Sequence, residues 1–279
     1  MPLSHYVCTN CGFWQRYFQG GPPACPVCLD YRHPLPPEGW EFQTSAQVAA
    51  NVSVHWQEVM PGIWQFWNEP QLGIGPRGYV VVEPAHGNIA FEGAGFYNQA
   101  ALDFIASLGG VRYLSASHCH VYGGLWQLVE VFRPEVVMQQ EELNFTQAFQ
   151  VSWPFDDQAE LHAGAVLYHT GGHTPGHTVL HLPARQLLFC GDALKFQLDD
   201  AGQAVAISTH RAYAAHIPLS HADVRRYQTV LEPLDFDGVL TPWEPVPHGG
   251  KSAARQLFAA QLAGRPFADF LPLSPSSLL

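Results

Sequence analysis

The sequence predicts a layered domain of β-sheets covered by helices, of the α/β or α+β class, which follows a small N-terminal cysteine module. Three observations support this fold class. From residue 52 onward, short segments with the period of strands are interleaved with segments of helical period. The first 42 residues differ in composition and contain two C-x2-C pairs. Hydrophobic residues make up 47% of the 279 residues and charged residues only 13%, so the chain can bury a substantial core.

The charge balance narrows the classes of partner. Lys and Arg number 13 against 24 Asp and Glu, which gives a formal net charge of −11. This balance argues against nucleic acid and against an anionic membrane surface, because both are bound through clustered cations. The opening MPLSHYVC lacks the basic and apolar regions of a signal peptide, and no apolar run is as long as a membrane span. We therefore expect a soluble cytoplasmic protein whose partner is a small-molecule substrate.

Four cysteines in the first segment have the spacing of a metal site, C-x2-C-x13-C-x2-C. Each C-x2-C turn places two thiolates on one side, and two facing turns form a tetrahedral site of four sulfurs. The predicted ligands are Cys8, Cys11, Cys25 and Cys28, with Zn²⁺ as the expected ion. So small a unit buries too little core to fold without metal. We assign residues 1–42 to a zinc-ribbon or rubredoxin-like module with its linker, and residues 43–279 to the main domain.

The role expected for this module is structural. Arg16 and Arg32 are its only Lys or Arg residues, which is too few for a nucleic-acid surface. We expect the module to shield an edge of the main domain or to form a contact in a homo-oligomer.

The main domain divides into predicted strands and helices. Alternation and short apolar runs predict strands over residues 52–59, 63–67, 78–84, 89–93, 111–117, 135–140, 165–171, 178–183, 187–192 and 238–242. Helical period predicts helices over residues 98–110, 125–132, 141–149, 222–234 and 251–264. Residues 85–88 are the predicted turn of a hairpin, Asn98 the predicted cap of the first helix, and Gly109-Gly110 its end.

Three predicted strand ends carry side chains typical of metal ligands. His118 and His120 follow the first, and residues i and i+2 of an extended segment point the same way. His173 lies in the loop HTGGHTPGHT, whose glycines allow sharp turns. Asp192 follows an apolar strand, a costly place for a carboxylate unless it is paired or bound to a metal. Together the three clusters predict a His/Asp metal site.

Other histidines and cysteines of the chain have simpler interpretations. We expect His169, His177 and His181 to be solvated or satisfied core residues rather than ligands. Strand alternation turns Cys119 away from its histidine neighbours, so that it packs in the interior, and Cys190 is expected in the core.

The segments SHCH, TGGHTPGHT and LLFCGD resemble motifs of the metallo-β-lactamase superfamily, in its hydroxyacylglutathione hydrolase-like branch, over about residues 52–262. The resemblance implies an α+β fold, a four-layer αββα sandwich with its metal site at one edge of two sheets. The first motif of that family is H-x-H-x-D-H. By position, His118 and His120 match its first two ligands, His173 matches the ligand of the third motif, and Asp192 matches the carboxylate that bridges two metals.

The chain departs from the family pattern at the ligands of the second metal. Tyr122 stands where the family has Asp, and Gly123 where it has His. At the last ligand, a C-terminal His, the alignment gives Glu244, and His248 lies four residues later. The resemblance therefore implies a mononuclear site of the four matched residues, with Zn²⁺ or Fe²⁺ as the ion. Whether Glu244 or His248 completes a second site stays open.

The function expected from this reasoning is metal-dependent hydrolysis of an ester, thioester or lactone. Asp192 would orient the attacking water or take its proton. Tyr122 would donate a hydrogen bond to the substrate oxyanion or leaving group, or else pack beside the site on a loop carbonyl.

Two other functions stay open. The first is a mononuclear iron oxidoreductase similar to persulfide dioxygenases, in which the cysteine module would hold iron as in the rubredoxin-like ends of rubrerythrins. The second is a non-catalytic, metal-stabilised binding protein.

Overall fold

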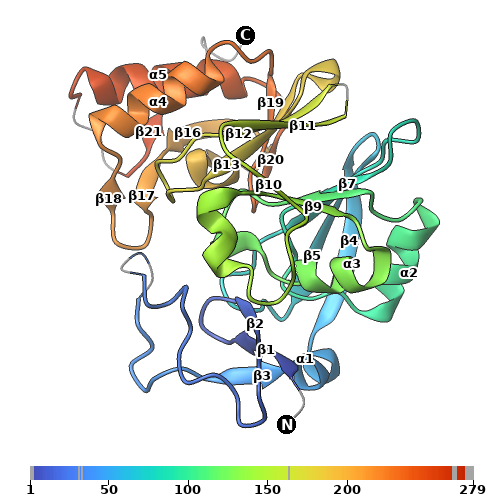
Figure 1. Ribbon diagram of the computed structural model, residues 1–279. Helices are drawn as coiled ribbons and strands as arrows, with labels where there is room; N and C mark the ends of the chain where they lie inside the picture. The colour runs from blue at the N-terminus through green and yellow to red at the C-terminus, as the bar shows by residue number, and fades with distance from the viewer. Residues whose placement is uncertain (1–2, 31, 33, 163, 266–268, 274–279) are drawn as a thin grey trace. The chain divides into compact units, whose positions relative to one another are not determined.

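The computed structural model describes residues 3–30, 32, 34–162, 164–265 and 269–273 (Figure 1). The chain divides into two compact units, residues 1–155 and residues 156–279. Within the described residues, none of the helices is long and apolar enough to cross a bilayer.

The first unit begins with a small antiparallel sheet in the order β2-β1-β3. Its strands are β1 (Ser4–Cys8), β2 (Trp14–Tyr17) and β3 (Phe42–Thr44). Because β3 pairs with β1, the chain returns after the second cysteine pair to close the module. Helix α1 (Ser45–Asn51) follows at once, and its start is fixed by a capping box between Thr44 and Gln47.

A seven-stranded sheet forms the main body of the first unit, in the order β10-β9-β8-β7-β6-β5-β4. Strands β4 to β7 pair as antiparallel neighbours, and β7 to β10 run parallel. The strands are β4 (Ser53–Met60), β5 (Ile63–Glu69), β6 (Gly78–Val81), β7 (Ile89–Phe91), β8 (Tyr113–Ser115), β9 (Glu135–Gln139) and β10 (Trp153–Phe155). Helices α2 (Gln99–Ser107) and α3 (Leu125–Phe132) provide the crossovers that parallel strands need.

The cysteine module packs onto this body within the same unit. The indole nitrogen of Trp14 donates to the carbonyl of Gly95 at 2.8 Å, and the indole is almost completely buried. The His5 ring stacks on Trp126 with 3.8 Å between ring centroids. These contacts fix the module against the loop after β7 and against α3.

The second unit contains a six-stranded sheet in the order β11-β12-β13-β14-β19-β20. Its strands are β11 (Gln158–His162), β12 (Ala165–His169), β13 (Thr178–Leu182), β14 (Leu187–Phe189), β19 (Gly238–Leu240) and β20 (Pro245–Val246). Helices α4 (His221–Leu231) and α5 (Gly250–Leu262) bury their apolar residues in a core shared with β13, β14 and β19. Smaller sheets join β15 (Lys195–Leu198), β16 (Ala204–Ser208) and β21 (Leu271–Pro272), and β17 (His210–Ala212) with β18 (Ile217–Pro218).

These elements confirm a mixed α+β fold and most of the predicted segments. Asn98 caps α2, because its side chain accepts a hydrogen bond from the backbone of Ala101.

The predicted helix over residues 141–149 is wrong: Gln140–Phe145 forms a short 3₁₀ helix. The buried carboxylate of Glu142 holds this turn by accepting hydrogen bonds from Cys119 and Tyr122, which a regular α-helix with a solvated face would not provide. In the main domain, the elements that the sequence did not predict are helix α1 and the short strands β10, β11, β15 to β18, β20 and β21.

Candidate metal centres

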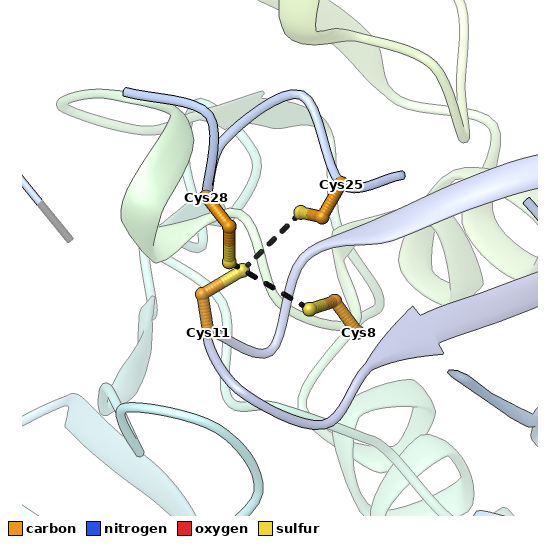
Figure 2. Close-up of side chains that lie close together, drawn as sticks. All are labelled: Cys8, Cys11, Cys25 and Cys28. Carbon is orange, nitrogen blue, oxygen red and sulfur yellow. Dashed lines mark hydrogen bonds between the residues drawn. The ribbon is translucent and has the colours of Figure 1, made fainter. Parts of the chain in front are cut away.

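The four cysteines of the module converge on one point (Figure 2). Strand β1 ends at Cys8, and the amide of Gly12 donates to the Cys8 carbonyl at 2.8 Å, which closes the first turn. In the second turn the amide of Leu29 donates to the Cys25 carbonyl at 3.1 Å. Each turn thus holds its two thiols on one side.

The distances between sulfurs fit a metal and not a disulfide. The Sγ atoms of Cys8 and Cys28 lie 3.7 Å apart, and those of Cys11 and Cys25 lie 3.6 Å apart. A tetrahedral ion with bonds of about 2.3 Å to sulfur separates its sulfurs by about 3.8 Å, whereas a disulfide needs about 2.05 Å. The Asn10 amide donates to the Cys28 sulfur at 3.3 Å, a bond that favours a thiolate.

Without a bound cation, the four thiols of this cluster cannot all become thiolates. Hydrogen bonds, first of all with Cys11, lower the pKa of the Cys8 thiol and of the Cys28 thiol. Hydrogen bonds with Cys25 and its neighbours raise the pKa of the Cys11 thiol. The pKa values of the thiols move in opposite directions because four potential anions are crowded into a buried space. A bound cation would balance their charge and allow all four to ionise.

The first histidine pair lies at the end of β8 in the first unit. His118 is extended, but Cys119–Val121 forms a 3₁₀ turn, so the predicted extended geometry of the pair is wrong for Cys119 and His120. A hydrogen bond holds this turn against the loop after β7: the amide of Gly93 donates to the Val121 carbonyl at 2.8 Å. The two imidazoles still adjoin, with ring centroids 4.7 Å apart, and both are buried.

Neighbouring polar groups orient the first of these rings. The Ser117 hydroxyl bonds Nδ1 of His118 at 2.8 Å, which leaves Nε2 as the nitrogen suited to an ion. The Ser117 amide in turn donates to the buried carboxylate of Glu92 at 3.0 Å.

Glu142 is a buried residue beside the candidate site that the sequence reasoning missed. Its side chain is 2% exposed, and one carboxylate oxygen accepts from the Cys119 amide at 2.9 Å and from the Tyr122 hydroxyl at 3.5 Å. Burial, followed by the nearby Glu142 charge, raises the pKa of Tyr122 well above its usual value, so the phenol stays protonated. The signal was available, because Glu142 closely follows an apolar strand just as Asp192 does.

The second candidate pair, His173 and Asp192, lies within the second unit. Nδ1 of His173 lies 3.0 Å from the carbonyl oxygen of His210. Because a carbonyl only accepts, Nδ1 carries a proton, and Nε2 is the nitrogen that faces Asp192, with a lone pair for an ion or with a second proton. This Nε2 lies 3.3 Å from Oδ2 of Asp192, and both side chains are buried. Ligands at about 2.0–2.1 Å from a tetrahedral ion are about 3.3 Å apart, so the pair has the spacing of two ligands of one metal.

His177 holds the backbone of Asp192 in place. The Asp192 amide donates to Nε2 of His177 at 3.1 Å, and the Thr170 hydroxyl bonds Nδ1 of His177 at 2.7 Å. His177 thus engages both ring nitrogens in the protein. His169 bonds the Pro175 carbonyl at 2.7 Å.

Glu244 and His248, the two residues considered as ligands of a second metal, each interact with another residue of the chain. Glu244 accepts from the backbone amide of Phe196 at 3.1 Å, and burial raises the pKa of this carboxyl. His248 is 81% exposed in its side chain and pairs with Asp237 at 2.9 Å. Cys119 and Cys190 are buried in the apolar cores of the first and second unit.

Comparison with known proteins gives consistent results. Residues 101–234 match the family model of the metallo-beta-lactamase superfamily. The uncharacterized protein YmaE of Bacillus subtilis (strain 168) is 21% identical over 252 residues, which cover 88% of this chain and 90% of that protein. Among solved structures, VMB-1 superposes with a TM-score of 0.55 at 17% identity, over 77% of this chain and 99% of that chain. The metallo-β-lactamase FIM-1 from Pseudomonas aeruginosa, in its mono-zinc form, gives 0.52 at 18% identity, over 76% and 95%.

These matches support the metallo-β-lactamase superfamily, most of whose members are metal-dependent hydrolases. The similarity to solved structures shows the fold, because the identities are low. The hydroxyacylglutathione hydrolase-like branch within the superfamily is not confirmed by any of them.

Proposed function

We propose that this protein is a metal-dependent hydrolase in which His118, His120, His173 and Asp192 share one ion and water is activated against an ester, thioester or lactone. The observation that carries the proposal is the His173–Asp192 pair. A buried imidazole lone pair and a carboxylate oxygen at 3.3 Å repel each other unless a proton or a cation lies between them. The motif order supports His118 and His120 as the remaining ligands.

The chemistry divides between the ion and the chain. A bound Zn²⁺ lowers the pKa of a water molecule to about 7 and polarises a carbonyl. The carboxylate of Asp192 orients the attacking water or takes its proton. The Tyr122 hydroxyl, which bonds Glu142 at 3.5 Å, would turn to donate to the oxyanion or leaving group.

A single ion, rather than two, fits the local backbone. Gly123, which stands where the family has a histidine ligand, has a φ of +41°, and a Cβ there would overlap the Ala94 carbonyl oxygen. A histidine therefore cannot replace it without moving the chain. The fold also accommodates one ion in FIM-1, which was solved in a mono-zinc form.

We propose Zn²⁺ for the four-cysteine site as well, with a structural role. The ion would fix the β1–β2 hairpin, whose Trp14 bonds the Gly95 carbonyl. Residues 93 and 94 in turn bond the turn after His118, through Gly93 to Val121 and Gly124 to Ala94. The module would thus support the loop that carries the first histidine pair.

Elemental analysis of protein purified without added metal tests the proposal. We expect one ion per chain at the cysteines and one at the His/Asp residues. His173→Ala should lose one ion and the hydrolysis of ester and thioester substrates, whereas the control His169→Gln should keep both. Two ions in the His173→Ala protein, or three in the wild type, would contradict the mononuclear site.

A mononuclear iron oxidoreductase is the second candidate. The sulfur spacings of 3.6 and 3.7 Å suit iron as well as zinc, and two histidines with a carboxylate are typical ligands of non-haem iron. Thiolate-to-iron absorption in the visible spectrum would favour this candidate, and a colourless protein with two zinc ions would favour the hydrolase. A fully loaded protein that is inactive on a broad ester and thioester panel would favour a binding protein. In each case we propose a small-molecule ligand and a cytoplasmic location.

A further inference from the structure

Two tyrosine hydroxyls of the second unit bond the main chain of the candidate ligands His173 and Asp192. Tyr227 lies on α4, and its phenol oxygen accepts a hydrogen bond from the His173 amide at 3.0 Å. Tyr213 lies in the turn between β17 and β18, and its hydroxyl donates to the Asp192 carbonyl at 3.1 Å. Each ligand backbone is therefore tied to an element that lies much later in the chain, by 54 and 21 residues respectively.

The ring of Tyr227 also supports the loop of His173 by direct contact. Tyr227 is completely buried, and a Cβ at Gly172 would lie only 2.6 Å from Cε1 of its ring. Gly172 has a φ of +79°, which also favours glycine at this position. The His173 amide meets the Gly171 carbonyl at 3.1 Å within a three-residue turn, so Tyr227 is its acceptor from outside the loop. The loop backbone thus rests on the phenol with no side chain between them.

The acceptor that Tyr227 provides is neutral. Burial raises the pKa of its hydroxyl, so the group stays a protonated phenol. A carboxylate in the same place would add a second buried anion whose charge acts on Asp192, which is costly without a further cation. Tyr227 therefore fixes the backbone of His173 and leaves the charge of the candidate site unchanged.

The backbone of Asp192 is fixed from two directions. Its amide donates to Nε2 of His177 at 3.1 Å, and its carbonyl accepts from Tyr213. The ring of Tyr213 also lies beside the imidazole of His173, with 5.9 Å between ring centroids. Tyr213 thus adjoins both members of the pair whose Nε2 and Oδ2 atoms are 3.3 Å apart.

The separation of two ligand atoms depends on how firmly their backbones are held. His173 and Asp192 come from different segments, the loop after β12 and the turn after β14, and a shift of either backbone moves its ligand atom by a similar amount. A functional constellation must be held to within about 0.5 Å. Groups that orient metal ligands in this way typically change metal affinity or activity by about tenfold to a hundredfold.

We infer that Tyr227 and Tyr213 are positioning residues that set the separation of His173 and Asp192 for one shared ion. The inference rests on the proposed metal site and adds two residues that act through the backbones of its ligands. Tyr227 has the larger effect, because Asp192 keeps its bond to His177 when the Tyr213 hydroxyl is removed.

Metal affinity of the full chain tests the inference without turnover. In competition with a chromophoric chelator, Tyr227→Phe should weaken the ion at the His/Asp residues by about tenfold to a hundredfold, and Tyr213→Phe by about three- to tenfold. Both variants should retain the ion at the four cysteines. The control Tyr168→Phe removes the hydroxyl of a half-buried tyrosine on β12 and should leave both affinities unchanged. Unchanged affinity in Tyr227→Phe or in Tyr213→Phe would overturn the assignment of that residue.

Phe258→Leu separates positioning from a purely structural role. Phe258 lies on α5 with its ring edge toward Tyr227, at 6.2 Å between centroids, so this variant loosens the packing but keeps the hydroxyl. It should lower the melting temperature of the metal-free protein at least as much as Tyr227→Phe does. Metal affinity should stay unchanged in Phe258→Leu, as should the visible spectrum of protein with Co²⁺ at the His/Asp residues and zinc at the cysteines. Tyr227→Phe should change both. An equal loss of affinity in the two variants would show that Tyr227 serves only the fold, and would overturn its assignment.

Turnover distinguishes this inference from the proposed function. At saturating Zn²⁺, Tyr227→Phe should lower kcat on ester and thioester substrates and leave KM unchanged, because the substitution moves a metal ligand. Weaker metal binding in Tyr227→Phe, together with a loaded wild type that hydrolyses none of these substrates, would reject the hydrolase and support the positioning role. Wild-type turnover with unchanged metal affinity in both tyrosine variants would overturn the inference and leave the hydrolase standing.

Discussion

The two candidate metal centres differ in how far apart in the chain their ligands lie. The four cysteines come from residues 8–28, on two tight turns of one small module. The candidate His/Asp ligands lie much farther apart in the sequence, between residues 118 and 192, and form one pair in each compact unit. The first centre is built by local turns, which spacing alone encodes. Each half of the second centre depends on distant neighbours, such as Glu92 and Glu142 for the first pair and His210 for His173.

The largest expected effect on stability is at the cysteine centre. Cys25→Ser should release the ion and lower the free energy of unfolding of the first unit by at least about 3–5 kcal/mol, because the metal supplies most of the module's folding energy. Urea unfolding followed by tryptophan fluorescence measures this, since Trp14 is buried at the contact with the body. The control Cys190→Ala removes one buried sulfur and should cost only about 1–2 kcal/mol with both ions retained. Equal losses in the two variants would contradict a metal-dependent module.

At the His/Asp centre we expect the reverse: a large effect on turnover and little effect on stability. Asp192→Asn should lower turnover by about 10²–10⁴-fold, because a metal ligand and proton acceptor is lost. The metal-free variant should be about as stable as the metal-free wild type, because the asparagine amide can donate a hydrogen bond to Nε2 of His173 where the carboxylate would share a proton with it. Steady-state kinetics and thermal unfolding of metal-free protein provide the two measurements. Wild-type turnover in the Asp192→Asn variant would remove this carboxylate from the mechanism.

The next effect tests whether the turn after His120 could hold a second ion. Gly123→Ala should destabilise the first unit by about 2–4 kcal/mol, because it combines a left-handed backbone with overlap on the Ala94 carbonyl. The matched control is Gly39→Ala, whose φ is +89° but whose Cβ would meet nothing within 4 Å. We expect about 1 kcal/mol there. Chemical denaturation of both variants provides the comparison, and similar losses would show that space at Gly123 is not limiting.

A smaller effect is expected from the glutamates of the following 3₁₀ turn. Glu142→Gln keeps an oxygen for the Cys119 amide but offers Tyr122 a weaker acceptor, and should reduce metal affinity at the histidine pair by about tenfold. Glu141→Gln, on the adjacent exposed residue, should leave the affinity unchanged. Competition with a chromophoric chelator measures both. If the two variants behave alike, Glu142 does not position the pair.

The smallest effect concerns pH and the buried carboxyl of Glu244. Burial raises its pKa in the folded state, so the folded protein binds more protons than the unfolded chain between the usual carboxyl pKa and the raised one. Stability should therefore fall as pH rises through that window. Glu244→Gln keeps an acceptor for Phe196 and should remove this slope, with a gain on the order of 1 kcal/mol at neutral pH. Unfolding curves between about pH 4 and pH 8 test the sign, and an unchanged slope would contradict it.

Much of the fold could be predicted because its signals are local. The turn at residues 85–88 joins antiparallel strands β6 and β7, and the Asn98 cap begins α2 as expected. The 3₁₀ helix at Gln140–Phe145 could not be predicted by period, because a buried carboxylate holds it through bonds to residues about 20 positions earlier. Helix α1 had a readable signal, since Thr44 and Gln47 have the spacing of a capping box.

By itself the sequence determined the cysteine cluster, most of the strand and helix order, and the residue types available for a His/Asp site, because each is encoded in spacing over a few residues. Only the tertiary structure decided the 3₁₀ turn at His120, the nitrogen of His173 that faces Asp192, the bond between Glu142 and Tyr122, and the tyrosine hydroxyls that bond the backbones of His173 and Asp192. Those features come from hydrogen bonds and close packing between residues distant in the chain, and no local pattern records them.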